Sequence, residues 1–132
     1  MTRSIVVTNA KGGVGKTTTV LALAAGLEFA GRELPAPWRI LVIDTDRQAH
    51  ATLMLTGRND FGRDASLAGL IESDRYDIDE LQSRILPSTW SPQICVLPAD
   101  RSLSKTDEHL ILLPRNEVRL SEPIAAVTDS YD

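Results

Sequence analysis

Near its N-terminus the chain reads Lys11-Gly12-Gly13-Val14-Gly15-Lys16-Thr17-Thr18. Backbone N–H groups alone can bind a phosphate if the chain curls tightly around it, and the glycines of this stretch permit such a curl. A helix beginning near Lys16 would point its N-terminal N–H groups and the positive end of its dipole into the same cradle. Lys16 supplies a positive charge for the outer phosphates, and the Thr17 hydroxyl suits a Mg²⁺ ligand. The stretch therefore predicts a phosphate-binding loop.

This loop departs from the strict pattern G-x-x-x-x-G-K-[ST]. Ala10 occupies the place of the first glycine, and Lys11 stands directly before the double glycine instead. The alternative interpretation is a glycine-rich turn with a solvent-facing lysine. We favour the phosphate loop, because six matching residues arise by chance with odds on the order of one in 10⁵ in a chain of this length.

The sequence on both sides of the loop predicts a strand, a helix and a second strand. Residues 4–8 are a short β-branched run closed by Asn9, which indicates a buried strand. From Lys16 an apolar, Ala/Leu-rich pattern predicts a helix that ends near Gly31. Residues 40–43 are continuously apolar and indicate another strand. Two strands joined by such a helix form a βαβ unit, so we expect an α/β fold with a parallel sheet and flanking helices.

The rest of the chain carries weaker patterns, from which we expect further helices and one more strand. Ser66 and Asp77 are suitable helix N-caps, residues 59–64 are a polar loop, and Pro98 stops the strand. The expected strand is 94–97, and the expected helices are 50–55, 66–72, 78–86, 102–113 and 121–128.

The composition is that of a single globular domain. The 132 residues are 42% hydrophobic and 24% charged, and 14 basic against 18 acidic residues give a net charge of −4. This length suffices for one hydrophobic core and is too short for two domains. The acidic balance excludes a general electrostatic attraction to nucleic acid or anionic membranes, although a local basic patch stays possible.

The cysteine count and the apolar runs predict a cytoplasmic protein. Cys95 is the single cysteine, so no internal disulfide can form. Its place within the apolar run 94–97 indicates a buried strand residue rather than a reactive thiol. The apolar stretch at residues 5–7 is too short for a secretory signal, and no apolar run approaches the roughly 20 residues of a transmembrane helix.

A pair of aspartates follows the expected strand 40–43, in the sequence Asp44-Thr45-Asp46. Two carboxylates at the C-terminal end of a strand beside a phosphate loop can hold hydrated Mg²⁺ and orient an attacking water. The alternative is a pair of acidic turn residues that caps the next helix. The neighbouring phosphate loop favours the role at a nucleotide.

The loop resembles the deviant Walker A motif of the ParA/MinD family of P-loop ATPases. The resemblance implies that Lys16 and Thr17 act on phosphate and Mg²⁺. It also implies that Lys11 is the family's signature lysine, which reaches across an ATP-bound dimer to the partner's nucleotide. Residues 40–48 resemble the family's strand ending in D-x-D-P-Q. By this resemblance Asp46 positions the attacking water, and Asp44 supports the metal shell and the loop.

Within the family, Gln48 and the pair Ala51-Thr52 are closest to the ParA/Soj-type partition ATPases. Arg47 replaces the usual proline, and His50, which replaces a small or amide residue, is expected on a helix surface. ATP and Mg²⁺ are the implied cofactors. The implied catalytic residues are Lys11, Lys16 and Asp46, the nucleotide-binding residues are Gly12, Gly13, Val14, Gly15, Lys16, Thr17 and Thr18, and the Mg²⁺ residues are Thr17 and Asp44.

The resemblance covers all 132 residues here but only about the first half of a typical family member. Ser130-Tyr131-Asp132 resembles the residues directly before the family's Walker B strand, and no later apolar run ends in aspartate after Leu97. We therefore expect residues 1–132 to form the N-terminal part of a P-loop NTPase-type domain with an incomplete sheet. We expect such a piece to hydrolyse ATP weakly or not at all, and to fold marginally because residues 4–8 lack their usual neighbours.

Three functions stay open at this point. The first is a partition ATPase, or its N-terminal piece, that forms an ATP-dependent homodimer, binds DNA non-specifically and responds to a ParB-like activator; the DNA and the activator rest on the resemblance alone. The second is a MinD-like ATPase of another branch, acting in cell-division placement, cargo positioning or electron transfer. The third is a truncated, catalytically silent nucleotide-binding or interaction module, which pairs with a full-length copy through the Lys11 face.

Overall fold

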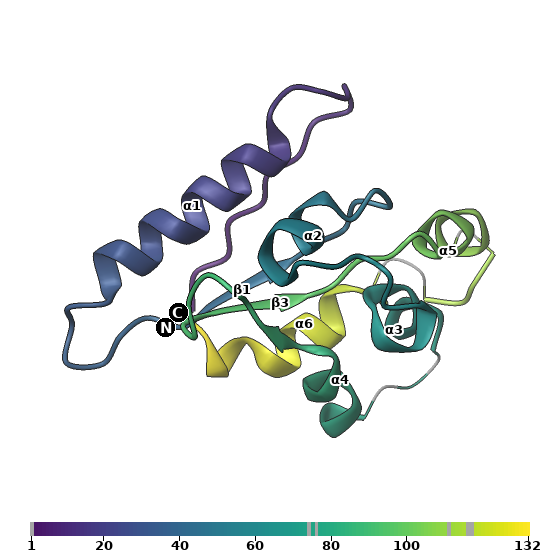
Figure 1. Ribbon diagram of the computed structural model, residues 1–132. Helices are drawn as coiled ribbons and strands as arrows, with labels where there is room; N and C mark the ends of the chain where they lie inside the picture. Colours follow the sequence, from purple (N-terminus) through teal and green to yellow (C-terminus); the bar gives the residue numbers. More distant parts are fainter. Residues whose placement is uncertain (1, 74, 76, 111, 116–117) are drawn as a thin grey trace.

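Three short strands form the sheet of this computed structural model, which describes residues 2–73, 75, 77–110, 112–115 and 118–132 (Figure 1). The strand order is β1-β3-β2. β1 (Ile40–Ile43) lies parallel to β3 (Ile94–Leu97), with Ile40 opposite Ile94 and Ile43 opposite Leu97. This parallel pair confirms the expected α/β class and the bounds of both strands.

The third strand corrects the prediction of a helix over residues 78–86. Helix α4 (Ile78–Arg84) ends earlier, and β2 (Leu86–Pro87) follows it and pairs antiparallel with β3. Pro87 cannot continue a helix, and it disfavours helical backbone in the residue before it. Proline is tolerated in this strand because β2 lies at the edge of the sheet. The sheet is therefore mixed rather than purely parallel.

The other helices lie close to their expected positions. Asp77 caps α4 by accepting a hydrogen bond from the Asp79 N–H, whereas Ser66 occupies the N-cap position of the next helix without a capping bond from its side chain. No described helix combines the length and the apolar character that a membrane span requires. The bounds are α1 (Lys16–Gly31), α2 (His50–Thr56), α3 (Leu67–Glu72), α5 (Leu103–Leu110) and α6 (Ser121–Val127), with short 3-10 helices η1 (Arg63–Ala65) and η2 (Thr128–Ser130).

Apolar side chains from the two faces of the sheet enter two separate core clusters. Successive residues of a strand point to opposite faces. Val42 of β1 and Val96 of β3 therefore join Ala24 of α1 and Leu55 of α2 on one face. Leu97 lies on the other face, where α3, α4 and α6 contribute the buried residues Leu67, Ala68, Leu70, Ile71, Leu81 and Val127. Figure 1 shows these two helical layers on either side of the strands.

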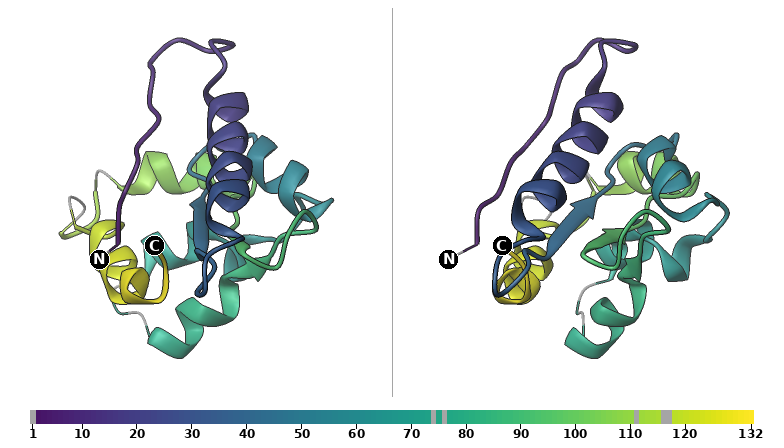
Figure 2. Two further views of the ribbon diagram at one scale, coloured as in Figure 1. Left: turned by 90° about the vertical axis from the view of Figure 1, so that its left-hand side faces the viewer. Right: turned by 60° about the vertical axis from the view of Figure 1, so that its left-hand side comes forward.

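Residues 4–8 do not form the predicted strand. They run beside α1 toward its N-terminal end, as Figures 1 and 2 show, and the side chains of Ile5 and Val6 are 60% and 82% exposed. A buried parallel strand needs hydrogen-bonded neighbours at its edges and helices over its faces, and none of the described strands pairs with these residues. The expected βαβ unit over residues 4–43 is therefore wrong. The parallel connection in this fold is the one between β1 and β3.

The two ends of the chain meet near the start of β1. The Thr2 hydroxyl oxygen lies 2.6 and 2.8 Å from the backbone oxygens of Thr128 and Tyr131, which share its single proton. The Asp132 N–H donates to the Arg39 carbonyl at 2.9 Å, and the Arg39 N–H donates to the Asp132 carboxylate at 2.9 Å. The C-terminal segment thus holds Arg39, the residue directly before β1.

Candidate functional site

The glycine-rich loop turns the chain directly into the N-terminus of α1. Gly13 and Gly15 have φ angles of 69° and 90°, in the left-handed region that favours glycine. Gly15 is the N-cap residue of α1, and its carbonyl accepts the N–H of Thr19 at 2.9 Å. At the other side of the loop, the Asn9 side chain accepts the N–H of Lys11 at 2.9 Å. The expected start of the helix at Lys16 is thereby confirmed.

The loop is exposed and protrudes from the body of the molecule. Residues 11–15 are all exposed, and Lys16 and Thr17 are half-buried. Figure 2 shows the loop at the tip of α1 in both views. The Lys16 ammonium group donates to the Lys11 carbonyl oxygen at 2.9 Å, so the lysine expected on phosphate lies across its own loop. A phosphate entering the loop has to replace this single contact.

The Asp44 carboxylate is buried and receives several hydrogen bonds. Its exposed fraction is 5%. One oxygen, Oδ2, accepts from both the N–H and the hydroxyl of Thr52, at 2.8 and 2.7 Å. The other oxygen, Oδ1, accepts from the N–H of Asp46 at 3.0 Å. The carboxylate therefore joins the end of β1 to α2, and Oδ1 is the oxygen that keeps spare acceptor capacity.

Asp46 has different surroundings, although it is only two residues away. It is exposed, and its Oδ1 accepts the N–H of Gln48 at 3.0 Å. Its carbonyl accepts the N–H of Ala49 at 2.8 Å. Ala49 is buried and has a φ of 52°, an unfavourable angle for a residue with a side chain. The aspartate therefore sits at the start of a tight turn with its carboxylate open to solvent.

The fold brings the loop and the acidic pair to the same end of the molecule. In Figures 1 and 2 the arrow of β1 points toward the end that carries the loop, and α1 packs against both β1 and α2. No hydrogen bond joins residues 11–18 to Asp44 or Asp46 in the described part of the chain. The expectation that His50 lies on a helix surface is confirmed, because the His50 side chain is exposed.

The two residues that the resemblance implies for Mg²⁺ have oxygen atoms suited to that ion. Thr17 offers a hydroxyl oxygen and Asp44 a carboxylate oxygen, and Mg²⁺ prefers such hard oxygen ligands while it keeps several waters. Among the described residues, no three His, Cys, Asp or Glu side chains converge as a ready-made metal site. A site here would therefore depend on oxygen atoms of the nucleotide as well as of the protein.

The contacts of two buried polar residues, Thr52 and Asp100, were not predicted from the sequence. Thr52 is fully buried, and its hydroxyl accepts the N–H of Ala99 at 3.0 Å. Asp100 follows β3 and accepts the N–H groups of Ser102 and Gly62, at 2.7 and 3.1 Å. The bonds from Gly62 to Asp100 and from Ala99 to Thr52 join residues 38 and 47 positions apart. No periodicity or motif indicates such long-range partners. The local bond from the Ser102 N–H to Asp100 is an Asx turn, which the sequence could have indicated.

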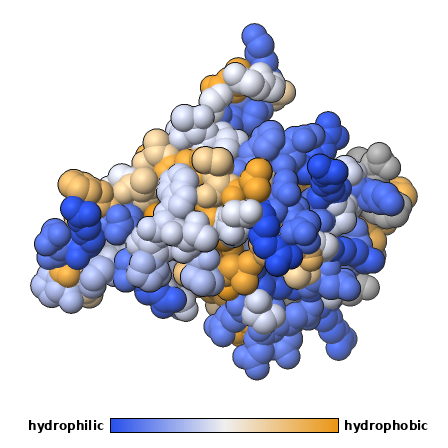
Figure 3. Space-filling model, in the orientation of Figure 1, coloured by the Kyte–Doolittle hydropathy of each residue, from blue (hydrophilic) through white to orange (hydrophobic). Residues whose placement is uncertain are grey.

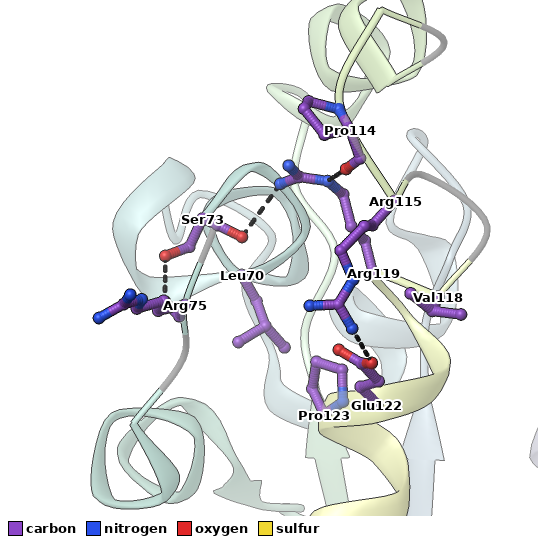
Figure 4. A pocket seen from close by; sticks show the side chains of 9 residues that line it. All are labelled: Leu70, Ser73, Arg75, Pro114, Arg115, Val118, Arg119, Glu122 and Pro123. Carbon is purple, nitrogen blue, oxygen red and sulfur yellow. Dashed lines mark hydrogen bonds and ion pairs between the residues drawn. The ribbon is translucent and has the colours of Figure 1, made fainter.

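A separate hollow lies between α3 and α6 (Figure 4). Two of the three arginines that line it, Arg115 and Arg119, have structural roles. Arg119 is buried and donates to the carbonyls of Ile71 and Ser73 at the end of α3, at 3.2 and 3.0 Å, and Arg115 pairs with Glu122. A cation at a helix C-terminus stabilises the helix dipole. We interpret this hollow as part of the fold rather than as a ligand site.

Comparison with known proteins decides the family. A family model described as an AAA domain matches residues 2–132. The chain belongs to this AAA domain family. The chain is 33% identical over 132 residues to the sporulation initiation inhibitor protein Soj of Bacillus subtilis. This alignment covers 100% of this chain and 47% of that protein. The chain is also 32% identical over 130 residues to the chromosome partitioning protein ParA of Myxococcus xanthus, covering 98% of this chain and 42% of that protein.

Solved structures support the same fold for this AAA domain. Cobyrinic acid a,c-diamide synthase from Mycobacterium smegmatis, solved with a bound ATP analog and magnesium, matches with a TM-score of 0.82 and 27% identity, over 100% of this chain and 49% of that one. Apo McdA from Cyanothece matches in fold with a TM-score of 0.71. The chain thus spans about half the length of the relatives it matches. The resemblance to the N-terminal portion of ParA/Soj-type proteins is confirmed.

Proposed function

We propose that this chain binds ATP and Mg²⁺ through residues 11–18, as the N-terminal part of a ParA-like partition ATPase. The observation that carries the proposal is the geometry of the loop, in which Gly13 and Gly15 turn the backbone into the N-terminus of a 16-residue helix. Backbone N–H groups at such a turn are suited to phosphate. The Mycobacterium smegmatis structure, with its ATP analog and magnesium, supports this choice of ligand.

The half-buried residues of the loop would act on the nucleotide directly. The Lys16 ammonium would leave the Lys11 carbonyl and pair with the outer phosphates. The Thr17 hydroxyl would hold Mg²⁺, and Asp44 would support the metal through its spare oxygen. The metal, when bound, supplies positive charge that neutralises the phosphate oxygens.

The exposed residues would act at a second surface and on the attacking water. Lys11 is exposed, so its side chain can reach a nucleotide held by another copy of the chain. ATP would in this way favour a homodimer. Asp46 is exposed at the end of β1, and its carboxylate would orient the water that attacks the outer phosphate. Non-specific DNA binding, a ParB-like activator and a cytoplasmic location enter this proposal from the resemblance alone.

Nucleotide binding is tested with Lys16→Ala. Titration of the protein with a fluorescent ATP analogue and Mg²⁺ is expected to show at least roughly tenfold weaker binding for this variant, since a charge-assisted contact contributes about 1.5–3 kcal/mol. Lys105→Ala is the matched control, because Lys105 is an exposed lysine on α5, outside the loop. Equal affinities of the wild type and Lys16→Ala would contradict the proposed site.

Dimerisation is tested separately with Lys11→Ala. We expect this variant to bind the nucleotide within about threefold of the wild type, because a lysine without phosphate contacts in its own loop contributes little there. The ATP-dependent increase in mass, measured by light scattering, should be lost. If the Lys11→Ala protein still dimerises with ATP, the proposed role of Lys11 in dimerisation is contradicted.

The second candidate is a nucleotide-binding module without turnover. It is favoured by the described strands, among which β1 alone is followed directly by an aspartate, Asp44. Phosphate release under saturating ATP and Mg²⁺ separates the two candidates. Turnover that is lost in Asp46→Ala supports the ATPase, and binding with no phosphate release supports the silent module.

A further inference from the structure

Thr52 is the fully buried residue that holds the Asp44 carboxylate in place. It lies in the first turn of α2 and is 0% exposed. Both its N–H and its hydroxyl donate to Asp44 Oδ2, at 2.8 and 2.7 Å. Asp44 and Thr52 are eight residues apart, so this contact joins the end of β1 to the next helix.

The carboxylate depends on these bonds because no basic side chain balances it. Among the described residues, no lysine, arginine or histidine forms an ion pair with Asp44. A buried charge without a counter-charge must be stabilised by hydrogen bonds. Asp44 receives such bonds from Thr52 on one oxygen and from the Asp46 N–H on the other.

The direction of the Thr52 hydroxyl proton follows from its neighbours. The Ala99 N–H lies 3.0 Å from Thr52 Oγ1, and an amide N–H can only donate. The hydroxyl therefore accepts from Ala99, and its single proton is directed to Asp44. The hydrogen bonds therefore have one direction. The Ala99 N–H, which follows β3, donates to Thr52, and the Thr52 hydroxyl donates to the Asp44 carboxylate.

These hydrogen bonds leave the two carboxylate oxygens of Asp44 with different capacity to accept a further ligand. Oδ2 already accepts two donors from Thr52, whereas Oδ1 accepts one donor from Asp46. A carboxylate oxygen has two lone pairs. Only Oδ1 therefore has capacity for a further ligand, such as Mg²⁺ or a water bound to it.

We propose that Thr52 is a positioning residue for the nucleotide site, which fixes the Asp44 carboxylate so that Oδ1 alone serves the metal shell. This inference rests on the proposed function, and it adds a residue outside the loop and outside the acidic pair. Asp44 acts on the metal or its water, and Thr52 acts only through Asp44.

The test compares Thr52→Val, which keeps the shape but loses the hydroxyl, with Thr52→Ser, which keeps the hydroxyl. The ratio of nucleotide Kd in EDTA to Kd in Mg²⁺ is measured for each. For Thr52→Val we expect this ratio to be roughly tenfold smaller than in the wild type, while its Kd in EDTA stays within about twofold of the wild-type value. For Thr52→Ser we expect a ratio within about twofold of the wild-type ratio. Thr56→Val is the matched control, since Thr56 lies one turn later in α2 and its hydroxyl donates to the backbone of Thr52 rather than to Asp44.

A second readout does not depend on nucleotide. Hydrogen exchange of the Ala99 amide should accelerate in Thr52→Val and stay slow in Thr52→Ser and Thr56→Val, because only the first variant removes its acceptor. If Thr52→Val does not fold, Thr52→Cys replaces it, with a smaller change of the same sign.

The outcomes separate this inference from the function on which it rests. A wild-type protein that binds no nucleotide overturns the proposed function, whatever Thr52 does to Ala99. A wild-type Mg²⁺ ratio in Thr52→Val or Thr52→Cys, together with faster exchange at Ala99, overturns the positioning role and leaves the nucleotide site intact.

Discussion

Asp44 and Asp46 stand two positions apart, yet the fold uses their carboxylates differently. Asp44 is buried and accepts hydrogen bonds on both oxygens, whereas Asp46 is exposed and accepts from the Gln48 N–H. The interpretation as turn and helix-capping residues is therefore confirmed in part, and the role at a nucleotide stays a prediction. Asp44 ties α2 to the sheet, and Asp46 is the carboxylate that is open to solvent.

Asparagine substitutions separate these two roles at the level of stability. In Asp44→Asn one acceptor oxygen becomes an NH₂ group that faces a donor, so we expect a loss of about 1–3 kcal/mol in the free energy of unfolding. In Asp46→Asn the remaining oxygen can still accept from Gln48, so a change within about 0.5 kcal/mol is expected. Urea unfolding followed by circular dichroism measures both. Equal losses in the two variants would show that burial does not distinguish the carboxylates.

The residues of the site were partly predictable from the sequence. The loop 11–18 and the acidic pair carry local signatures, because phosphate binding needs glycines, a lysine and a hydroxyl in one short stretch. The self-contact of Lys16 with the Lys11 carbonyl and the buried partners Thr52 and Ala99 were not predicted. Their positions depend on how separate elements pack, which residue order alone does not specify.

At the scale of elements, the apolar runs with local signals were predicted well. The helix at 16–31 and the strands at 40–43 and 94–97 have the expected bounds, since each combines a strong pattern with a clear stop. Residues 4–8 show a similar β-branched pattern and yet remain outside the sheet. A strand forms only with hydrogen-bonded partners, so its sequence pattern is a necessary condition and not a sufficient one.

Two glycines of α1 have opposite environments and give a test of its packing. Gly26 is exposed, and a Cβ placed there would meet nothing within 4 Å. We expect Gly26→Ala to raise the free energy of unfolding by about 0.5–1 kcal/mol, because alanine loses less backbone entropy in a helix. A Cβ at Gly31 would lie 2.7 Å from the Trp38 ring. We expect Gly31→Ala to lower stability by about 1–3 kcal/mol through overpacking.

Neither glycine has a positive φ angle, so the pair isolates helix propensity from steric contact. Thermal and urea unfolding of the two variants provide the measurement. A destabilised Gly26→Ala protein would mean that this face of α1 is covered in solution. A neutral Gly31→Ala protein would mean that Trp38 does not pack against the end of the helix.

At the scale of the whole molecule, apolar surface is unevenly covered. Figure 3 shows apolar residues gathered over α1, beside a largely hydrophilic surface over the helices at the right. Phe29 on α1 is 63% exposed, and Ile5 and Val6 are 60% and 82% exposed in the segment that runs along this helix. A helix that is apolar on all sides is typical of a position buried on all sides. Because α1 is instead partly exposed, the buried apolar contacts that stabilise this chain lie in the two clusters that flank β1 and β3.

The stability of the fold near the C-terminal segment is expected to depend on pH through Tyr131. Tyr131 packs against the core beside Cys95, and the Arg39 guanidinium lies 5.1 Å from its ring. Burial, reinforced by the charge of Cys95 and the hydrogen bond to it, raises the pKa of Tyr131 from 10.0 to about 12, while Arg39 acts in the opposite direction. The folded protein therefore favours the neutral phenol more strongly than the unfolded chain does.

The sign of the pH effect follows from this raised pKa. Stabilisation by the neutral phenol is fully present below pH 10.0 and is lost as the pH rises toward about 12, because the unfolded chain releases the proton first. We expect the urea midpoint of the wild type to fall more steeply over this window than that of Tyr131→Phe, which has no proton to lose. Cys95→Ala is the control and should keep most of the slope, since burial is the largest cause of the shift. If Tyr131→Phe followed the wild-type slope, the loss of stability at alkaline pH would originate from a group other than this phenol.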